Sequence, residues 1–294
     1  MTNEPIKVLN DGFVQLIDHM GSDQAICNAA RVSYGNHEVI KKGYTLYENK
    51  EKDNSLIRYL MRHRHSTPFE MTAIVFLVRC PIHVARQWMR HRTWSYNEYS
   101  TRYKEAIDSF ETTEPDAWRL QATDNKQGSG EYLHTRLEDT EEDTLYDGNY
   151  LTGQETYLHK ELKCRYQERI NAGVAREQAR KDLPLSTYTE FYAKADLRNM
   201  LHFLSLRMDP HAQLEIRLFA EAMSKIIEPL FPASYQAFSD YVLNACTFSA
   251  QEMYYIRQMA GVAEFGEWQI QSEDNGLSKR EIKELYEKLG VDCA

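Results

Sequence analysis

Cysteine is scarce in this 294-residue chain, and its five cysteines are not spaced for a common task. They lie far apart and contain no Cys-x-x-Cys pair, at Cys27, Cys80, Cys164, Cys246 and Cys293. An odd, scattered set of this kind argues against a disulfide framework and against a zinc knuckle. We therefore expect a protein of a reducing compartment, the cytoplasm.

Long apolar segments are also missing. The longest unbroken run of aliphatic and aromatic residues, Ala73 to Val78, is far shorter than the roughly 20 residues of a membrane-spanning helix. The first residues, MTNEPIKVLNDGF, contain no apolar signal core. Hydrophobic residues nevertheless make up 42% of the chain, which is enough for a sizeable core. We expect a soluble, globular protein with no membrane partner.

Positive charge is in deficit overall, yet it is concentrated in one segment. The formal net charge is -9, which disfavours nonspecific binding to DNA or to an anionic membrane, and we expect no nucleic-acid partner. The segment from Arg79 to Lys104, however, contains six cationic residues and a single acid, Glu98, and tyrosines, serines and a tryptophan are interleaved with them. Guanidinium groups and hydroxyls hold phosphate, and aromatic faces accept a ring. This basic segment predicts a site for a small anion.

Hydrophobic periodicity in the first hundred residues predicts both helices and strands. The expected elements are broken β alternation over Ile6–Ile17 with a turn at Asp11-Gly12, a helix over Asp23–Val32 capped by Ser22 or Asp23, a helix over Asn54–His63, a strand over Phe69–Cys80 and a helix over Ile82–Arg92. The strand is apolar at alternating positions of both faces, so we expect it to be buried on both sides. The helix that follows Pro81 places Gln87, Arg90 and His91 on neighbouring positions.

The second half of the chain begins with an acidic, polar stretch from Glu111 to about Asn149, which predicts an insertion-like excursion. The elements expected after it are helices over Gln154–Ala172 and Ala175–Lys181, a strand over Tyr188–Ala195, a helix over Asp196–Arg207, further helices from Phe231 and a last helix over Ser278–Leu289 with a capping box of Ser278 and Glu281. Asp209-Pro210 has the form of a helix start, with Asp as the cap and Pro in the first turn, which places Arg207 at a junction between helices.

A longer string in the basic segment, RHRTWSYNEYSTRY, closely resembles the signature of flavin-dependent thymidylate synthases. Two further blocks agree with this resemblance: HRHSTPFE upstream, and AREQARKDLPL followed by LRNMLHFLSLRMDPHAQLEI downstream. The resemblance covers roughly Val8 to Pro232. It implies an α+β fold with a central mixed or antiparallel sheet flanked by long helices, a catalytic domain over residues 1–232 and a helical C-terminal extension over residues 233–294.

The resemblance implies methylation of dUMP to dTMP, with methylenetetrahydrofolate as the carbon donor and with FAD, reduced by NADPH, delivering the hydride. It also implies a homotetramer whose active sites are shared between subunits. Arg207 is the implied catalytic residue, because a permanent guanidinium over the pyrimidine favours the ring deprotonated at N3. The activated uracil is then the nucleophile, and no enzyme cysteine is needed.

The implied site residues fall into three sets. The dUMP set is Gln87, Trp88, Met89, Arg90, Glu98, Tyr99, Ser100, Thr101, Arg102, Arg180 and Arg207. The FAD set is Thr67, Arg90, His91, Arg92, Glu98, Asp196, Leu197, Arg198 and His202, and His65 and His211 are implied neighbours of the flavin or folate ring. Thr101 stands where many members of the family have glycine, and Asp196 and His202 where several have asparagine.

Several of these residues also allow other interpretations. Outside the motif, Trp88 and Met89 are typical core residues, Glu70 is a typical partner for an arginine, and His63-x-His65 lacks further ligands for a metal, so no metal is predicted. Cys80-Pro81-Ile82-His83 superficially resembles the nucleophile motif of cysteine-dependent thymidylate synthases, but the order differs and a thiol at the end of a buried strand has a raised pKa. The non-enzymatic alternative is a nucleotide- or RNA-binding module without flavin.

Overall fold

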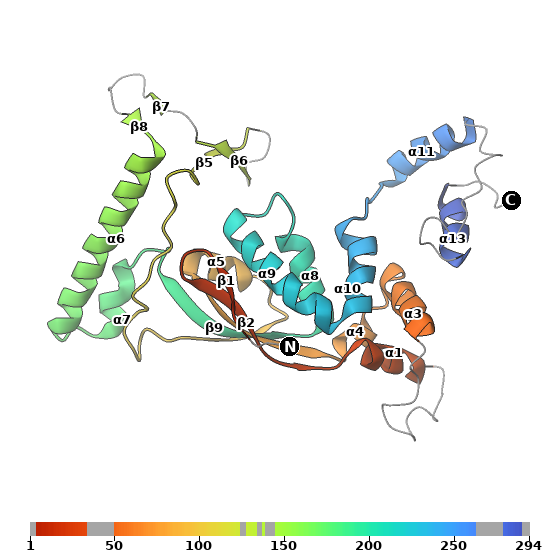
Figure 1. Ribbon diagram of the computed structural model, residues 1–294, viewed down its shortest axis with the longest axis horizontal. Coiled ribbons are helices and arrows are strands. Elements are labelled where there is room, and N and C mark those ends of the chain that lie inside the picture. The colour runs from red at the N-terminus through yellow and green to blue at the C-terminus, as the bar shows by residue number, and fades with distance from the viewer. Residues whose placement is uncertain are drawn as a thin grey trace. The chain divides into compact units, whose positions relative to one another are not determined.

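The computed structural model describes residues 4–33, 50–123, 128–133, 137–138, 145–262 and 279–289 (Figure 1). By its internal contacts the chain divides into two compact units, residues 1–243 and residues 244–294. The first unit contains the sheet and every predicted site residue. The helices of the second unit are therefore described separately.

The first unit is built on a five-stranded sheet in the order β1-β2-β3-β9-β4, with every neighbouring pair antiparallel. Its strands are β1 (Ile6–Val8), β2 (Gly12–Met20), β3 (Ala73–Pro81), β4 (Ser95–Glu98) and β9 (Tyr188–Ala195). The turn predicted near Asp11 joins β1 to β2, and a Cβ at Gly12 would lie 2.6 Å from the carbonyl oxygen of Val8, so only glycine fits there. The expected α+β class is confirmed.

The central strand β3 differs from its prediction. It begins at Ala73, because Phe69 and Glu70 belong to the one-turn helix α4 (Thr67–Glu70), which has Pro68 in its first turn. Along β3, buried and half-buried side chains alternate, so the strand is not buried on both faces. Ile74, Phe76, Val78 and Cys80 are buried on one face, where helices cover the sheet, whereas the other face is only partly covered. Such one-sided burial is typical of antiparallel sheets.

Helices of the first unit pack on the buried face of the sheet or on one another. They are α1 (Asp23–Val32), α3 (Lys50–Arg62), α5 (Ile82–Trp88), α8 (Leu197–Arg207), α9 (Leu214–Leu230) and α10 (Pro232–Phe238). Helix α5 packs on β3 and β9, α9 packs on β1 and β2, and α8 packs against α9 (Figure 1). At the centre, Trp88 is fully buried and stacks on Phe203 with ring centroids 4.8 Å apart. As predicted, Ser22 caps α1 by accepting a hydrogen bond from the Ala25 amide.

Two predicted helix boundaries near the site are wrong. Helix α5 ends at Trp88 rather than at Arg92, because the chain turns there and the His91 amide bonds to the Trp88 carbonyl. Helix α9 begins at Leu214 rather than at Asp209-Pro210. Asp209 instead accepts hydrogen bonds from the amide and the ring of His211, so its carboxylate closes a local turn instead of capping a helix. Arg207 is nevertheless the last residue of α8.

The acidic stretch contains the short strands β5 (Arg119–Gln121), β6 (Ser129–Tyr132), β7 (Leu137–Glu138) and β8 (Leu145–Tyr146). Helix α6 (Gly148–Asn171) follows and begins earlier than predicted, because Asp147 caps it at the Tyr150 amide. A one-turn helix α7 (Arg176–Ala179) then leads into a 3-10 turn (Arg180–Asp182). These elements place Arg180 just before strand β9.

The first unit ends in a π-helical turn (Ser239–Leu243) after α10. The second unit contains α11 (Ala250–Val262) and α13 (Lys279–Leu289). Ser278, the predicted cap of the last helix, lies outside the described residues. Among the residues that are described, no helix combines the length and the apolar character needed to cross a bilayer.

Candidate active site

The first group of predicted site residues lies where α5 ends. Pro81 closes β3 and stands at the start of α5, and the buried Trp88 anchors the other end of this helix. Beyond Trp88 the chain turns, so Arg90 and Arg92 are exposed while His91 between them is buried. The hydroxyl of Tyr96 lies 3.0 Å from the Trp88 carbonyl and 3.1 Å from that of His91, which holds the turn in place.

Arg207, at the end of α8, is held by this turn. Its Nε donates to Nε2 of His91 at 3.1 Å, and its terminal nitrogen Nη2 donates to the carbonyl oxygen of Gln87 at 3.3 Å. Burial first, and the nearby Arg207 and His202 after it, lower the pKa of His91 from 6.5 to about 4. His91 is therefore a neutral acceptor at neutral pH. Arg207 has no carboxylate partner among the described residues, and burial lowers its pKa from the usual value.

A cavity of ≈ 550 Å³ opens beside this pair. It is lined by Arg90, His91, Arg92, Thr93, Arg198, Asn199, His202, Leu206 and Arg207. Within the described part of the chain, the side chains of Arg90 and Arg92 make no hydrogen bond or ion pair, and Arg198 has only an ion pair of 3.4 Å to Glu70. Glu70 thus pairs with an arginine, as predicted from its sequence outside the motif. The cavity is strongly cationic, which suits an anionic ligand.

Two further cavities share residues with this one. One of ≈ 310 Å³ contains His65 and is joined to the first through Arg198 and His202. The other, of ≈ 360 Å³, contains Gln87 and His211 and is joined through Arg207. The structure therefore places His65, His211 and the arginines on cavities that share lining residues. Thr67 lies at the start of α4, directly after residues that line the ≈ 310 Å³ cavity.

The second group of predicted residues follows β4 and is centred on Thr101. Its hydroxyl accepts a hydrogen bond of 2.5 Å from Arg180, so the threonine orients an arginine. Arg102 lies 3.7 Å from Glu177, with both side chains more than half exposed. The remaining members are fixed by β9 and the adjoining loop: Thr189 donates to Glu98 at 2.7 Å, and the Tyr99 hydroxyl donates to the Glu105 carbonyl at 2.6 Å.

The two groups are held by different polar contacts. Among the described residues no hydrogen bond or ion pair links the group around Arg207 to the group around Thr101. Ser100 contributes to the second group, where its hydroxyl accepts from the Arg102 amide at 3.4 Å.

Some predicted site residues are oriented toward the interior. The side chains of Trp88 and Leu197 are fully buried, so only their backbone atoms are available to a ligand, and Met89 packs against the core. The amide of Leu197 already donates to the hydroxyl of Thr72 at 2.9 Å. Asp196 caps α8, and its two oxygens accept from the amide and the side chain of Asn199. The acid at position 196 therefore has a structural partner of its own.

Two residues beside the site were not identified by the sequence analysis. Gln213 precedes α9 and accepts a hydrogen bond from the side-chain amide of Gln87. His83 lies one turn before Gln87 on α5 and contacts the same Gln213. The only sequence signal was the spacing of His83 and Gln87, which puts both on one helix face.

Cys80 does not contribute to this site. The residue is fully buried at the end of β3, and burial first, with a smaller effect of Glu98, raises the pKa of its thiol well above the usual value. A thiol of this kind carries almost no thiolate at neutral pH. The arrangement therefore offers guanidinium groups and a neutral imidazole for chemistry on an anionic ring, and no cysteine nucleophile at this position.

Comparisons with known proteins agree with this geometry. The family model described as thymidylate synthase complementing protein matches residues 15–233. A flavin-dependent thymidylate synthase of Wolbachia pipientis wMel is 44% identical over 97% of this chain and 92% of its own length, and one of Ruegeria pomeroyi is 42% identical over 96% of this chain and 87% of its own. A crystal structure of the UMP/dUMP methylase PolB from Streptomyces cacaoi, bound with 5-Br dUMP, has a TM-score of 0.68 and 35% identity, covering 81% of this chain and 99% of that protein. The chain belongs to the flavin-dependent thymidylate synthase family.

Proposed function

We propose that the chain converts dUMP to dTMP, with methylenetetrahydrofolate as the carbon donor and with FAD, reduced by NADPH, as the hydride carrier. The observation that carries this proposal is the setting of Arg207. Its guanidinium faces a cationic cavity without a carboxylate partner among the described residues, and it is aimed by His91 and the Gln87 carbonyl. Family membership disfavours the alternative of a flavin-free binding module.

The cavity residues fit a dinucleotide cofactor. Arg90 and Arg92 have no partner in the described part of the chain and are suited to the diphosphate of FAD. The proposed FAD contacts are Thr67, Arg90, His91, Arg92, Glu98, Asp196, Leu197, Arg198 and His202, with His65 and His211 near the flavin or folate ring. When bound, FAD supplies the hydride that reduces the transferred carbon to a methyl group.

For dUMP, the chain supplies charge and orientation. The proposed contacts are Gln87, Trp88, Met89, Arg90, Glu98, Tyr99, Ser100, Thr101, Arg102, Arg180 and Arg207. Arg207 stabilises the negative charge that develops on the pyrimidine when its N3 proton is lost, and a guanidinium does so without giving up its own proton. His91, which has a pKa of about 4, stays neutral and accepts from Arg207 throughout.

We further propose a homotetramer whose subunits share active sites. The partly uncovered face of β3 supports this part of the proposal. In the same proposal residues 1–232 form the catalytic domain, residues 233–294 are a helical extension, and the protein works in the cytoplasm.

The test uses the purified full-length chain. The protein should retain a visible flavin spectrum after gel filtration, be reduced by NADPH and form dTMP only when dUMP and methylenetetrahydrofolate are both present. UMP is assayed in parallel, because the Streptomyces protein is described as a UMP/dUMP methylase. A protein that binds dUMP, holds no flavin and forms no dTMP would replace this proposal with the binding-module alternative.

A further inference from the structure

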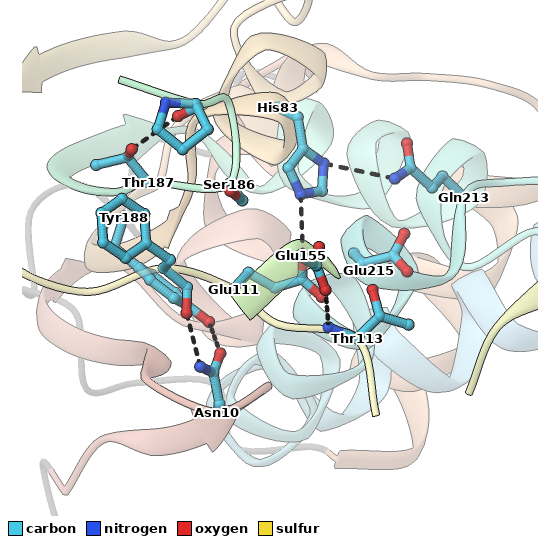
Figure 2. Close-up of polar contacts among 12 residues, drawn as sticks. Asn10, His83, Glu111, Thr113, Glu155, Ser186, Thr187, Tyr188, Gln213 and Glu215 are labelled. Atoms are coloured by element: carbon cyan, nitrogen blue, oxygen red, sulfur yellow. Dashed lines mark hydrogen bonds and ion pairs between the residues drawn. The ribbon is translucent and has the colours of Figure 1, made fainter. Parts of the chain in front are cut away.

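Gln213 links two side chains of α5. His83 and Gln87 lie one helical turn apart, so both face the segment that precedes α9. The side-chain amide of Gln87 donates to Oε1 of Gln213, and Nε2 of Gln213 lies 3.5 Å from Nδ1 of His83. Figure 2 shows the second of these contacts, with His83 directed at Gln213 on one side and at Glu111 on the other.

The direction of this chain of contacts follows from the chemistry of the groups. An amide nitrogen only donates, so in this contact Nδ1 of His83 is the acceptor. The proton of His83 is then on Nε2, which faces the carboxylate of Glu111 at 3.7 Å. Each group therefore determines the state of the next. The Glu111 carboxylate favours the His83 tautomer with its proton on Nε2, the imidazole orients the Gln213 amide, and Gln213 orients the Gln87 amide.

The groups around His83 on other elements are acidic. Glu111 is 14% exposed and comes from the loop that follows the basic segment, and Glu155 on α6 accepts a hydrogen bond of 2.8 Å from the Thr113 amide. Burial first, and then the proximity of Glu111, raise the pKa of Glu155. Glu215 on α9 is drawn beside them in Figure 2 and is paired with Arg119 at 2.5 Å.

The consequence concerns the part of Gln87 that faces the ligand region. Because Nε2 of Gln87 is engaged by Gln213, Oε1 is left as an acceptor, and no described residue donates to it. Gln87 lines the same cavity as Arg207 and His211. Without the His83 acceptor, the two orientations of the Gln213 amide would have similar energies. Gln87 would then present its NH2 group to the cavity as readily as its oxygen.

We propose that His83 and Gln213 are positioning residues that orient Gln87 as a hydrogen-bond acceptor for a donor group of the pyrimidine nucleotide. This inference rests on the proposed function, which supplies the nucleotide. In dUMP, apart from the phosphate, the two donor groups are the imide N3–H and the 3′-hydroxyl. Neither His83 nor Gln213 needs to touch the nucleotide.

The test compares His83→Asn with His83→Phe in the flavin-loaded full-length enzyme. Asparagine places an acceptor oxygen where Nδ1 stands, whereas phenylalanine keeps the ring and removes the acceptor. Binding of dUMP, measured by calorimetry, should weaken about three- to tenfold in His83→Phe, the size expected for one neutral hydrogen bond, and stay within about twofold of wild type in His83→Asn. The KM for dUMP should rise in the same way, while kcat and the KM for methylenetetrahydrofolate change little. His19→Phe, at an exposed position on β2 outside the cavities, is the matched control.

Nucleotide analogues identify the donor. If 2′,3′-dideoxyuridine monophosphate, which lacks the 3′-hydroxyl, binds wild type and His83→Phe equally, the sugar is the donor; equal binding of N3-methyl-dUMP identifies the imide. The inference is overturned if His83→Phe binds dUMP as wild type does, if His83→Asn is as impaired as His83→Phe, or if both analogues still distinguish His83→Phe from wild type. Failure of wild type to bind dUMP at all would instead overturn the proposed function.

Discussion

Arg207 and His91 are joined by a hydrogen bond of 3.1 Å between Nε and Nε2, although they lie 116 positions apart in the chain. The bond needs an imidazole without a proton on Nε2, and the lowered pKa of His91 provides one. The guanidinium is thus oriented by a neutral group, so its charge is left for the ligand. An acid in the place of His91 would hold Arg207 as firmly but would neutralise it.

The pKa of His91 predicts how stability depends on pH. Between about pH 6.5 and about pH 4, unfolded His91 is largely protonated while folded His91 is not, so the unfolded state binds more protons and stability falls as pH falls. Below about pH 4 both states are protonated and this contribution stops changing. Urea unfolding across this window should show a shallower pH dependence for His91→Gln than for wild type. Identical slopes would contradict the assignment of a buried neutral histidine.

The hydrogen bond between Thr101 and Arg180 predicts an effect on dUMP binding. Thr101→Val removes the hydroxyl that accepts from Arg180 but keeps the shape of the side chain, so Arg180 stays present and becomes less well oriented. Affinity for dUMP should fall about three- to tenfold. Thr101→Ser keeps the acceptor and should bind dUMP as wild type does. Calorimetry on the two variants decides the matter, and equal binding by the valine and serine variants would show that the hydroxyl has no role in the site.

Arg102 tests the proposed phosphate contact. Its side chain is 58% exposed and only loosely paired with Glu177, so it is available to a ligand. Arg102→Ala should weaken dUMP binding by roughly ten- to a hundredfold, the range of a charge-assisted hydrogen bond, while NADPH still reduces the flavin. Arg165→Ala is the control, because Arg165 on α6 is similarly exposed and paired with Glu161 and Glu168. Unchanged calorimetric affinity in Arg102→Ala would remove this residue from the phosphate site.

Substitution of Cys80 distinguishes a flavin-dependent route to dTMP from one that uses a cysteine thiolate. Because its thiol is buried and its pKa is raised, Cys80→Ala should retain thymidylate formation and lose only packing, about 1 kcal/mol of stability. Thermal unfolding measures the packing loss and product formation measures the chemistry. Complete loss of turnover in a folded, flavin-bound variant would favour a thiolate mechanism.

Much of the fold was predictable because local pattern and tertiary burial agree in it. Strand β9 has the predicted bounds, Tyr188–Ala195. Helix α8 starts directly after Asp196, because the aspartate caps the helix through a local contact that does not depend on tertiary packing. The misplaced start of α9 has the opposite cause. The carboxylate of Asp209 could cap a helix or accept hydrogen bonds in a local turn. In the structure it accepts from His211 in the turn, so it does not cap α9.

The site was predictable in its residue types and not in its contacts. The RHR signature identified the arginines, yet the pairs Arg207–His91 and Gln213–Gln87 join positions more than a hundred residues apart. Such pairs depend on how α5, α8 and α9 pack around Trp88. The contact of His83 was not predictable, because its partner Gln213 belongs to a different element and a single histidine on a helix gives no signal of it.

The central claim is that Arg207 stabilises the activated pyrimidine in a flavin-dependent methylation. The most direct measurement is anaerobic single-turnover reoxidation of the reduced flavin with dUMP and methylenetetrahydrofolate, followed for wild type and for Arg207→Lys, which keeps the charge but loses the planar fork. The account predicts dUMP-dependent reoxidation with formation of dTMP in wild type. It predicts a rate on the order of a hundredfold lower in the lysine variant, with flavin content unchanged, if the transition-state contact is worth about 3 kcal/mol. Equal rates in the two proteins, or reoxidation that does not depend on dUMP, would contradict it.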